Sequence, residues 1–141
     1  MSCWVPGRPK TKGSLDFQPG KKCRCCDRCE AYLPGGRAVE NVAGSSRWRQ
    51  LMSYAVEHTD VVSATAAEGP VVVVAVFHLP VVDVAGGRVG DLDKLARNLL
   101  DALTDAGVYG DDVQVTRLVC EKVPADMTGR GPGVDLRVLV P

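Results

Sequence analysis

The 141-residue sequence has no net charge, no long hydrophobic stretch and only two histidines. A balance of 17 basic and 17 acidic residues argues, taken alone, against a protein that binds nucleic acid through overall charge. The longest apolar run, residues 70–79, is too short to span a bilayer. Residues 1–10 contain no apolar segment of the kind found in signal peptides. We therefore expect a cytoplasmic protein with no membrane partner.

The neutral average hides an uneven distribution of charge. Residues 1–50 contain ten Lys/Arg against four Asp/Glu, whereas residues 51–141 contain seven against thirteen. A basic arm joined to an acidic core suits an enzyme that holds a polyanion on one surface and binds cations on another. The two halves neutralising each other without any function is the alternative that charge alone leaves open.

The hydrophobic pattern predicts an α+β fold with a small mixed β-sheet and two helices in a single domain, residues 1–141. A short edge strand at residues 3–6 is followed by a basic loop and a cysteine-rich insert at about residues 20–37. Ser45 and Ser46 offer an N-cap for the first helix. The β-branched run 71–79 predicts a central strand buried on both faces. Two more strands are expected at residues 113–123 and 134–140, joined by a hairpin loop, so the order is β, loop, α, β, α, β, β.

The second helix lies in a segment that holds six aspartates between residues 90 and 115. Apolar residues recur along it from Leu92 to Ala106 at helical spacing, and Gly107 supplies the stop. Asp91 and Asp93 fall at its start, where acidic residues also complement the helix dipole with no catalytic purpose. A β–α–β return could bring Asp112 back beside them, and three such carboxylates would suit Mg²⁺.

The acidic segment carries a specific sequence motif. It reads Asp91-Leu92-Asp93, then Asp101-Ala102-Leu103, then Gly107 and Asp111-Asp112-Val113-Gln114-Val115. With the opening Val5-Pro6-Gly7-Arg8-Pro9-Lys10, it resembles the RusA family of Holliday junction resolvases, small endonucleases often encoded by phages and prophages.

The resemblance implies a homodimeric, Mg²⁺-dependent endodeoxyribonuclease that resolves four-way (Holliday) DNA junctions by symmetric cleavage in DNA recombination and repair, in the cytoplasm of a bacterial host. The family's metal-binding aspartates fall on Asp91, Asp93 and Asp112. This chain departs from the family at two positions, with Lys94 in place of Asn and Arg97 in place of Lys. Arginine keeps its proton, so Arg97 can add only fixed positive charge and phosphate contacts to catalysis.

The basic residues predict where DNA would bind. Arg8, Lys10 and Lys12 of the basic arm, with Lys94, are expected to contact phosphates and so supply affinity without reading sequence. A loop that is merely solvated is the alternative interpretation.

The cysteine cluster contains two overlapping C-x-x-C pairs, formed by Cys23, Cys26 and Cys29. Such a pair is half of a structural Zn²⁺ site, and free thiols or a disulfide remain open as alternatives. Further ligands would come from Cys3, Cys120, one of the two histidines or a dimer mate. His58 and His78 each stand alone in the sequence, and such histidines more often pack in the core or cap a helix than act in catalysis.

Two other functions remain open from the sequence. One is a non-catalytic nucleic-acid-binding protein with a resolvase-like fold and a zinc knuckle, in which Lys94 and Arg97 have cost the activity. The other, weaker one is a small-molecule metalloenzyme that uses the cysteines. A cleavage assay on a four-way junction separates the nuclease from both.

Overall fold

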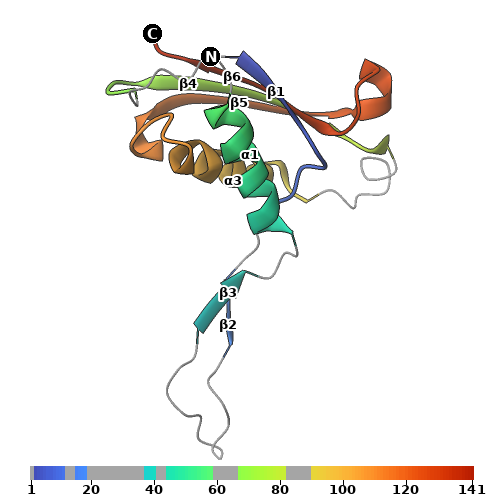
Figure 1. Ribbon diagram of the computed structural model, residues 1–141, viewed down its shortest axis with the longest axis horizontal. Helices are drawn as coiled ribbons and strands as arrows, with labels where there is room; N and C mark the ends of the chain where they lie inside the picture. Colours follow the sequence, from blue (N-terminus) through green and yellow to red (C-terminus); the bar gives the residue numbers. More distant parts are fainter. Residues whose placement is uncertain (1, 12–14, 19–36, 41–43, 59–66, 82–89) are drawn as a thin grey trace, which may run out of the picture. The chain divides into compact units, whose positions relative to one another are not determined.

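The computed structural model describes residues 2–11, 15–18, 37–40, 44–58, 67–81 and 90–141 (Figure 1). The chain divides into two compact units, residues 13–43 and the remainder. The described part of the smaller unit is a hairpin of β2 (Leu15–Gln18) and β3 (Arg37–Glu40), which pair antiparallel. No strand had been predicted in either segment.

The larger unit contains a four-stranded mixed sheet and two helices, which confirms the α+β prediction. The strands are β1 (Ser2–Pro6), β4 (Val71–Leu79), β5 (Val115–Pro124) and β6 (Gly133–Leu139), in the spatial order β1-β6-β4-β5. Only the β4–β5 pair is parallel. Helices α1 (Ser45–Glu57) and α3 (Leu92–Asp105) lie along one side of this sheet (Figure 1). Among the described helices none has the length and apolar character needed to cross a membrane.

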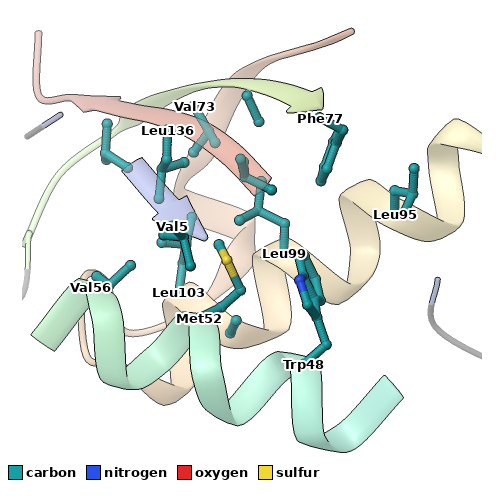
Figure 2. Packing of buried hydrophobic residues seen from close by; sticks show 14 of the residues in the cluster. Val5, Trp48, Met52, Val56, Val73, Phe77, Leu95, Leu99, Leu103 and Leu136 are labelled. Atoms are coloured by element: carbon teal, nitrogen blue, oxygen red, sulfur yellow. The ribbon is translucent and has the colours of Figure 1, made fainter. Parts of the chain in front are cut away.

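The core fills the space between the two helices and the sheet (Figure 2). The predicted apolar stripe of α3 is confirmed, with Leu95, Leu99 and Leu103 all buried. Helix α1 contributes Trp48, Met52 and Val56, which lie four residues apart and so on one face of the helix. The sheet contributes buried side chains from β1, β4 and β6. The residues labelled in Figure 2 are Val5, Trp48, Met52, Val56, Val73, Phe77, Leu95, Leu99, Leu103 and Leu136.

Strand β4 was predicted at its observed bounds, but it is not buried on both faces. Val71, Val73, Ala75 and Phe77 are buried, whereas the intervening valines are only half-buried. The reason is that both described helices cover the same face of the sheet, so in the described part of the chain only that face of β4 is buried along its whole length.

Two local predictions were also wrong. Strands β5 and β6 do not form a hairpin, because β6 pairs with β1 and β4 and so leaves β4 between them. Helix α1 is preceded by Gly44, in a left-handed conformation, rather than capped by a serine hydroxyl. Ser45 is instead its first residue and is buried.

Candidate functional site at the two ends of helix α3

The first end of α3 presents two carboxylates to solvent. Asp91 is the N-cap residue, and its backbone carbonyl accepts from the N–H groups of Lys94 and Leu95. Its side chain makes no capping hydrogen bond and is 71% exposed, so the carboxylate is left free of the helix backbone. Asp93, in the first turn, is 62% exposed. Both groups can therefore accept an incoming cation.

Each of these carboxylates has a basic neighbour on the same helix. The Nζ atom of Lys94 lies 3.4 Å from Oδ2 of Asp91, and Nη2 of Arg97 lies 4.0 Å from Oδ2 of Asp93. These are exposed i,i+3 and i,i+4 pairs, which contribute at most a few tenths of a kcal/mol each. A divalent cation or a phosphate can displace them at little cost.

The backbone of the basic arm is fixed against this end. Asn98 of α3 is buried, and its Nδ2 donates to the carbonyl of Lys10 at 2.9 Å and to Oγ of Ser45 at 3.2 Å. A Cβ at Gly90 would lie 2.2 Å from Cγ2 of Thr11, so the chain just before Asp91 needs glycine. The segment that carries Arg8 and Lys10 therefore approaches the start of α3 through its backbone.

The second end of α3 leads into a tight, well-bonded turn. Gly107 adopts φ 68°, which confirms the predicted stop, and η1 (Asp112–Gln114) follows. Asp111 caps η1: its Oδ1 accepts from the N–H of Val113 at 2.9 Å, and Oε1 of Gln114 accepts from the N–H of Asp111 at 3.2 Å. The amide of Gln114 also donates to two carbonyls just before β4. Asp111 is therefore a structural residue, whereas the equally exposed side chain of Asp112, the next residue, makes no capping bond.

An open pocket of about 350 Å³ adjoins this turn, lined by Arg49, Asp101, Thr104, Asp105, Gly110, Asp111 and Asp112. The guanidinium of Arg49 lies 3.5 Å from Asp101 and 3.2 Å from Asp105, and so neutralises part of this acidic surface. Tyr109, in the segment between α3 and η1, is buried, and its hydroxyl donates to the carbonyl of Leu100. Burial raises the pKa of Tyr109, and the charge of Asp112 adds to that rise.

The two ends are separated by the length of the helix. Fourteen residues at 1.5 Å each place them about 20 Å apart. The predicted β–α–β return exists, but α3 runs back along the sheet, so Asp112 comes to the beginning of β5 while Asp91 and Asp93 stay near the end of β4. Within the described residues no group of three or more acidic, histidine or cysteine side chains could hold a metal ion. One chain therefore holds Asp91 and Asp93 together but not with Asp112.

The structure describes only some of the predicted zinc ligands. The cysteine cluster at residues 23–29 lies outside the described residues, as does Lys12, which was predicted to bind DNA. Cys3 and Cys120 are free thiols on β1 and β5, the two outer strands of the sheet, and burial raises the pKa of each. His58 hydrogen-bonds to the carbonyl of Tyr54 at the C-cap of α1, and His78 is buried beside Asp135. These histidines have the packing and capping roles expected of them.

Sequence reasoning missed four residues that shape this region. Asn98 and Arg49 connect α3 to other segments, and Gln114 and Tyr109 hold the turn that carries Asp112. Gln114 stood inside the recognised motif, so its place could have been noted. Asn98 and Arg49 gave no signal, because their partners are 88 and 52 residues away.

Comparison with known proteins agrees with the motif. The family model described as endodeoxyribonuclease RusA matches residues 30–138, which include both helices and the strands β3 to β5. None of the curated proteins matches the chain.

Proposed function

We propose, because this chain belongs to the RusA endodeoxyribonuclease family, that it is a structure-specific nuclease that resolves four-way DNA junctions. The observation that carries the proposal is the family match together with Asp91 and Asp93, whose carboxylates are exposed and make no capping bond at the start of a rigid helix. Carboxylates left free in this way are suited to chemistry rather than to holding the helix.

The proposed activity depends on Mg²⁺ held by Asp91, Asp93 and Asp112. When bound, Mg²⁺ would activate water and neutralise charge on the phosphodiester. Asp91 and Asp93 offer oxygen ligands of the kind that Mg²⁺ prefers. Arg97, on the next turn of the same helix, contributes a permanent positive charge that a phosphate would attract away from Asp93.

The three aspartates of one chain lie at opposite ends of α3, so the proposal requires two copies. In a two-fold dimer, Asp91 and Asp93 of one chain can meet Asp112 of the partner subunit, which gives two equivalent sites. A four-way junction is itself two-fold symmetric, and two sites related by symmetry would cut opposite strands. The proposed homodimer therefore has a structural reason as well as a functional one.

DNA would be held by the basic arm and by the start of α3. Arg8 and Lys10 lie in the segment whose backbone Asn98 fixes, and Lys94 is placed beside Asp91. Lys12 continues the same basic run in the sequence. Phosphate contacts from such residues supply affinity that falls steeply with salt, so junction affinity measured at two salt concentrations tests this part.

The first experiment is cleavage of a synthetic four-way junction in Mg²⁺, compared with the same reaction in EDTA and with a linear duplex of equal length. We expect paired nicks in the junction only when Mg²⁺ is present. A protein that binds the junction but leaves it intact under all conditions would contradict the proposal.

Mixing two inactive variants tests whether the site is shared between chains. In a heterodimer of Asp91→Asn and Asp112→Asn, a shared site would be intact on one side, so an equal mixture should recover about a quarter of the wild-type sites. A mixture of Asp91→Asn with Asp93→Asn should recover nothing, because both changes fall on the same half of every site. If neither mixture recovers activity, the three aspartates do not act across two chains.

A second function is favoured by one observation. Lys94 and Arg97 already pair with the two carboxylates, as they would in a family member that binds junctions without cutting them. The double variant Lys94→Asn/Arg97→Lys distinguishes the two readings. A non-catalytic binder would gain Mg²⁺-dependent cleavage from this change, whereas an active nuclease already has it.

A further inference from the structure

Strand β5 is the long outer strand of the sheet. It contains ten residues and, within the described part of the chain, pairs only with β4. Leu118 and Val119, at its middle, are 40% and 41% exposed. An outer strand of this length with exposed apolar side chains is prone to pair with another strand unless something covers it. We infer that it pairs antiparallel with β5 of a second copy, which rests on the dimer of the proposed function.

Symmetry restricts the possible registers of such a pair. In an antiparallel ladder, facing residues alternate between hydrogen-bonded and non-hydrogen-bonded pairs. A two-fold axis perpendicular to the sheet must therefore pass between a residue and its own copy, because any other position would superimpose the two kinds of pair. An axis near the middle of this ten-residue strand pairs most of its length, which makes Leu118, Val119 and Cys120 the central candidates.

Charge selects one of these three registers. With Val119 at the axis, Arg117 faces Glu121 of the partner subunit, and the symmetric copy gives a second pair of opposite charges. With Leu118 or Cys120 at the axis, Glu121 faces a valine instead. Arg117 and Glu121 are both exposed and lie on the sheet face away from the helices, in register with Val72 and Val76. The register centred on Val119 is therefore the favoured one.

This pairing also determines where the second copy contributes to the site. Antiparallel strands place the beginning of the partner's β5 beside the end of this one. That end adjoins the end of β4, since Leu79 pairs with Pro124, and it is from the end of β4 that the chain continues towards Asp91. Asp112 of the partner subunit, three residues before its β5, thus moves to the end of the sheet at which Asp91 and Asp93 lie.

A cysteine at the axis provides a direct test. In Val119→Cys the two introduced thiols would face each other with Cα atoms about 5 Å apart, within the range for a disulfide. We expect a covalent dimer under mild oxidation, seen on non-reducing gels and reversed by reductant. Lys122→Cys is the matched control, because it lies on the same strand but far from its own copy. Wild type shows what the native cysteines do alone. Equal cross-linking in both variants, or none in Val119→Cys, would overturn the register.

Charge reversal tests the paired contacts. Arg117→Glu places like charges opposite each other twice and should weaken the dimer roughly tenfold to a hundredfold, measured by light scattering across a dilution series. The double variant Arg117→Glu/Glu121→Arg should restore it. A dimer that the single change leaves as strong as wild type, or that the double change fails to restore, would contradict the inference.

The interface and the enzymatic proposal can fail separately. A cross-linked Val119→Cys dimer that cuts no junction in Mg²⁺ would retain the interface and remove the nuclease. A wild-type protein that cuts junctions while Val119→Cys remains uncross-linked would retain the nuclease and remove this interface.

Discussion

Both ends of helix α3 are rich in aspartate, but the carboxylates at the two ends are bonded differently. At the first, the carboxylates of Asp91 and Asp93 make no capping bond and pair with basic side chains of the same helix. At the second, Asp111 is held in a capping box, and Arg49 forms ion pairs with Asp101 and Asp105 that offset part of their charge. The side chain of Asp112, beside them, is exposed and takes part in neither arrangement. A count of carboxylates therefore says little about function until the bonds of each one are known.

The neighbouring pair Asp111 and Asp112 gives the largest expected contrast. Asp112→Asn should reduce junction cleavage by roughly a hundredfold or more while junction binding persists, because a ligand of the proposed site loses its charge. Asp111→Ala should retain cleavage and lower the free energy of unfolding by about 1 kcal/mol, since it removes a cap. Single-turnover cleavage and chemical denaturation measure the two effects. Equal loss of cleavage in both variants would make the distinction between them wrong.

A glycine near each end allows the packing to be compared. Gly90→Ala should destabilise the protein by about 1–3 kcal/mol, because its Cβ would overlap Thr11. The Cβ added in Gly110→Ala would have only Oε1 of Gln114 near it, at an ordinary contact distance of 3.5 Å, so this change should alter stability little. Thermal unfolding of the two variants beside wild type provides the measurement. A stable Gly90→Ala protein would mean that the basic arm is not packed tightly against the start of α3.

Tyr109 gives the second end its own pH dependence. Burial raises the pKa of its hydroxyl in the folded state above the ordinary value of 10.0. The contribution of the buried, protonated Tyr109 to the free energy of unfolding is thus complete below about pH 10, and it is lost as the pH rises towards the folded pKa. We expect the free energy of unfolding to fall above pH 10 in wild type and to fall less steeply in Tyr109→Phe. Parallel slopes for the two proteins between pH 9 and 11 would show that Tyr109 is not the group responsible.

The smallest contrast concerns the ion pairs. Arg49→Ala should lower the free energy of unfolding by about 1 kcal/mol, since Arg49 joins α1 to two aspartates of α3 and its side chain is two-thirds buried. Arg97→Ala should cost less than about 0.5 kcal/mol, because its single pair is exposed on both sides. Urea denaturation of both variants at low and high salt measures this. If Arg97→Ala lowered the free energy of unfolding more than Arg49→Ala does, Arg97 would contribute to stability rather than remain available to bind phosphate.

The sequence predicted much of the fold at the level of single elements. Strand β4 was found at its observed bounds and α3 to within one residue, because each has an unbroken pattern of one period. The hairpin of β2 and β3 was missed, and β5 and β6 were wrongly joined as neighbours. Strand partners depend on contacts distant in sequence, and hydrophobic pattern alone carries no information about them.

The acidic segment illustrates the same limit within the site. Its sequence by itself determined that α3 is a helix, that it stops before Gly107, and which family it resembles; the family match bears out that resemblance. Only the tertiary structure decided that Asp112 lies a helix length from Asp91, because that follows from β5 pairing parallel to β4. The spacing of aspartates along a chain is local information, whereas their distance in space is determined by the direction in which α3 crosses the sheet.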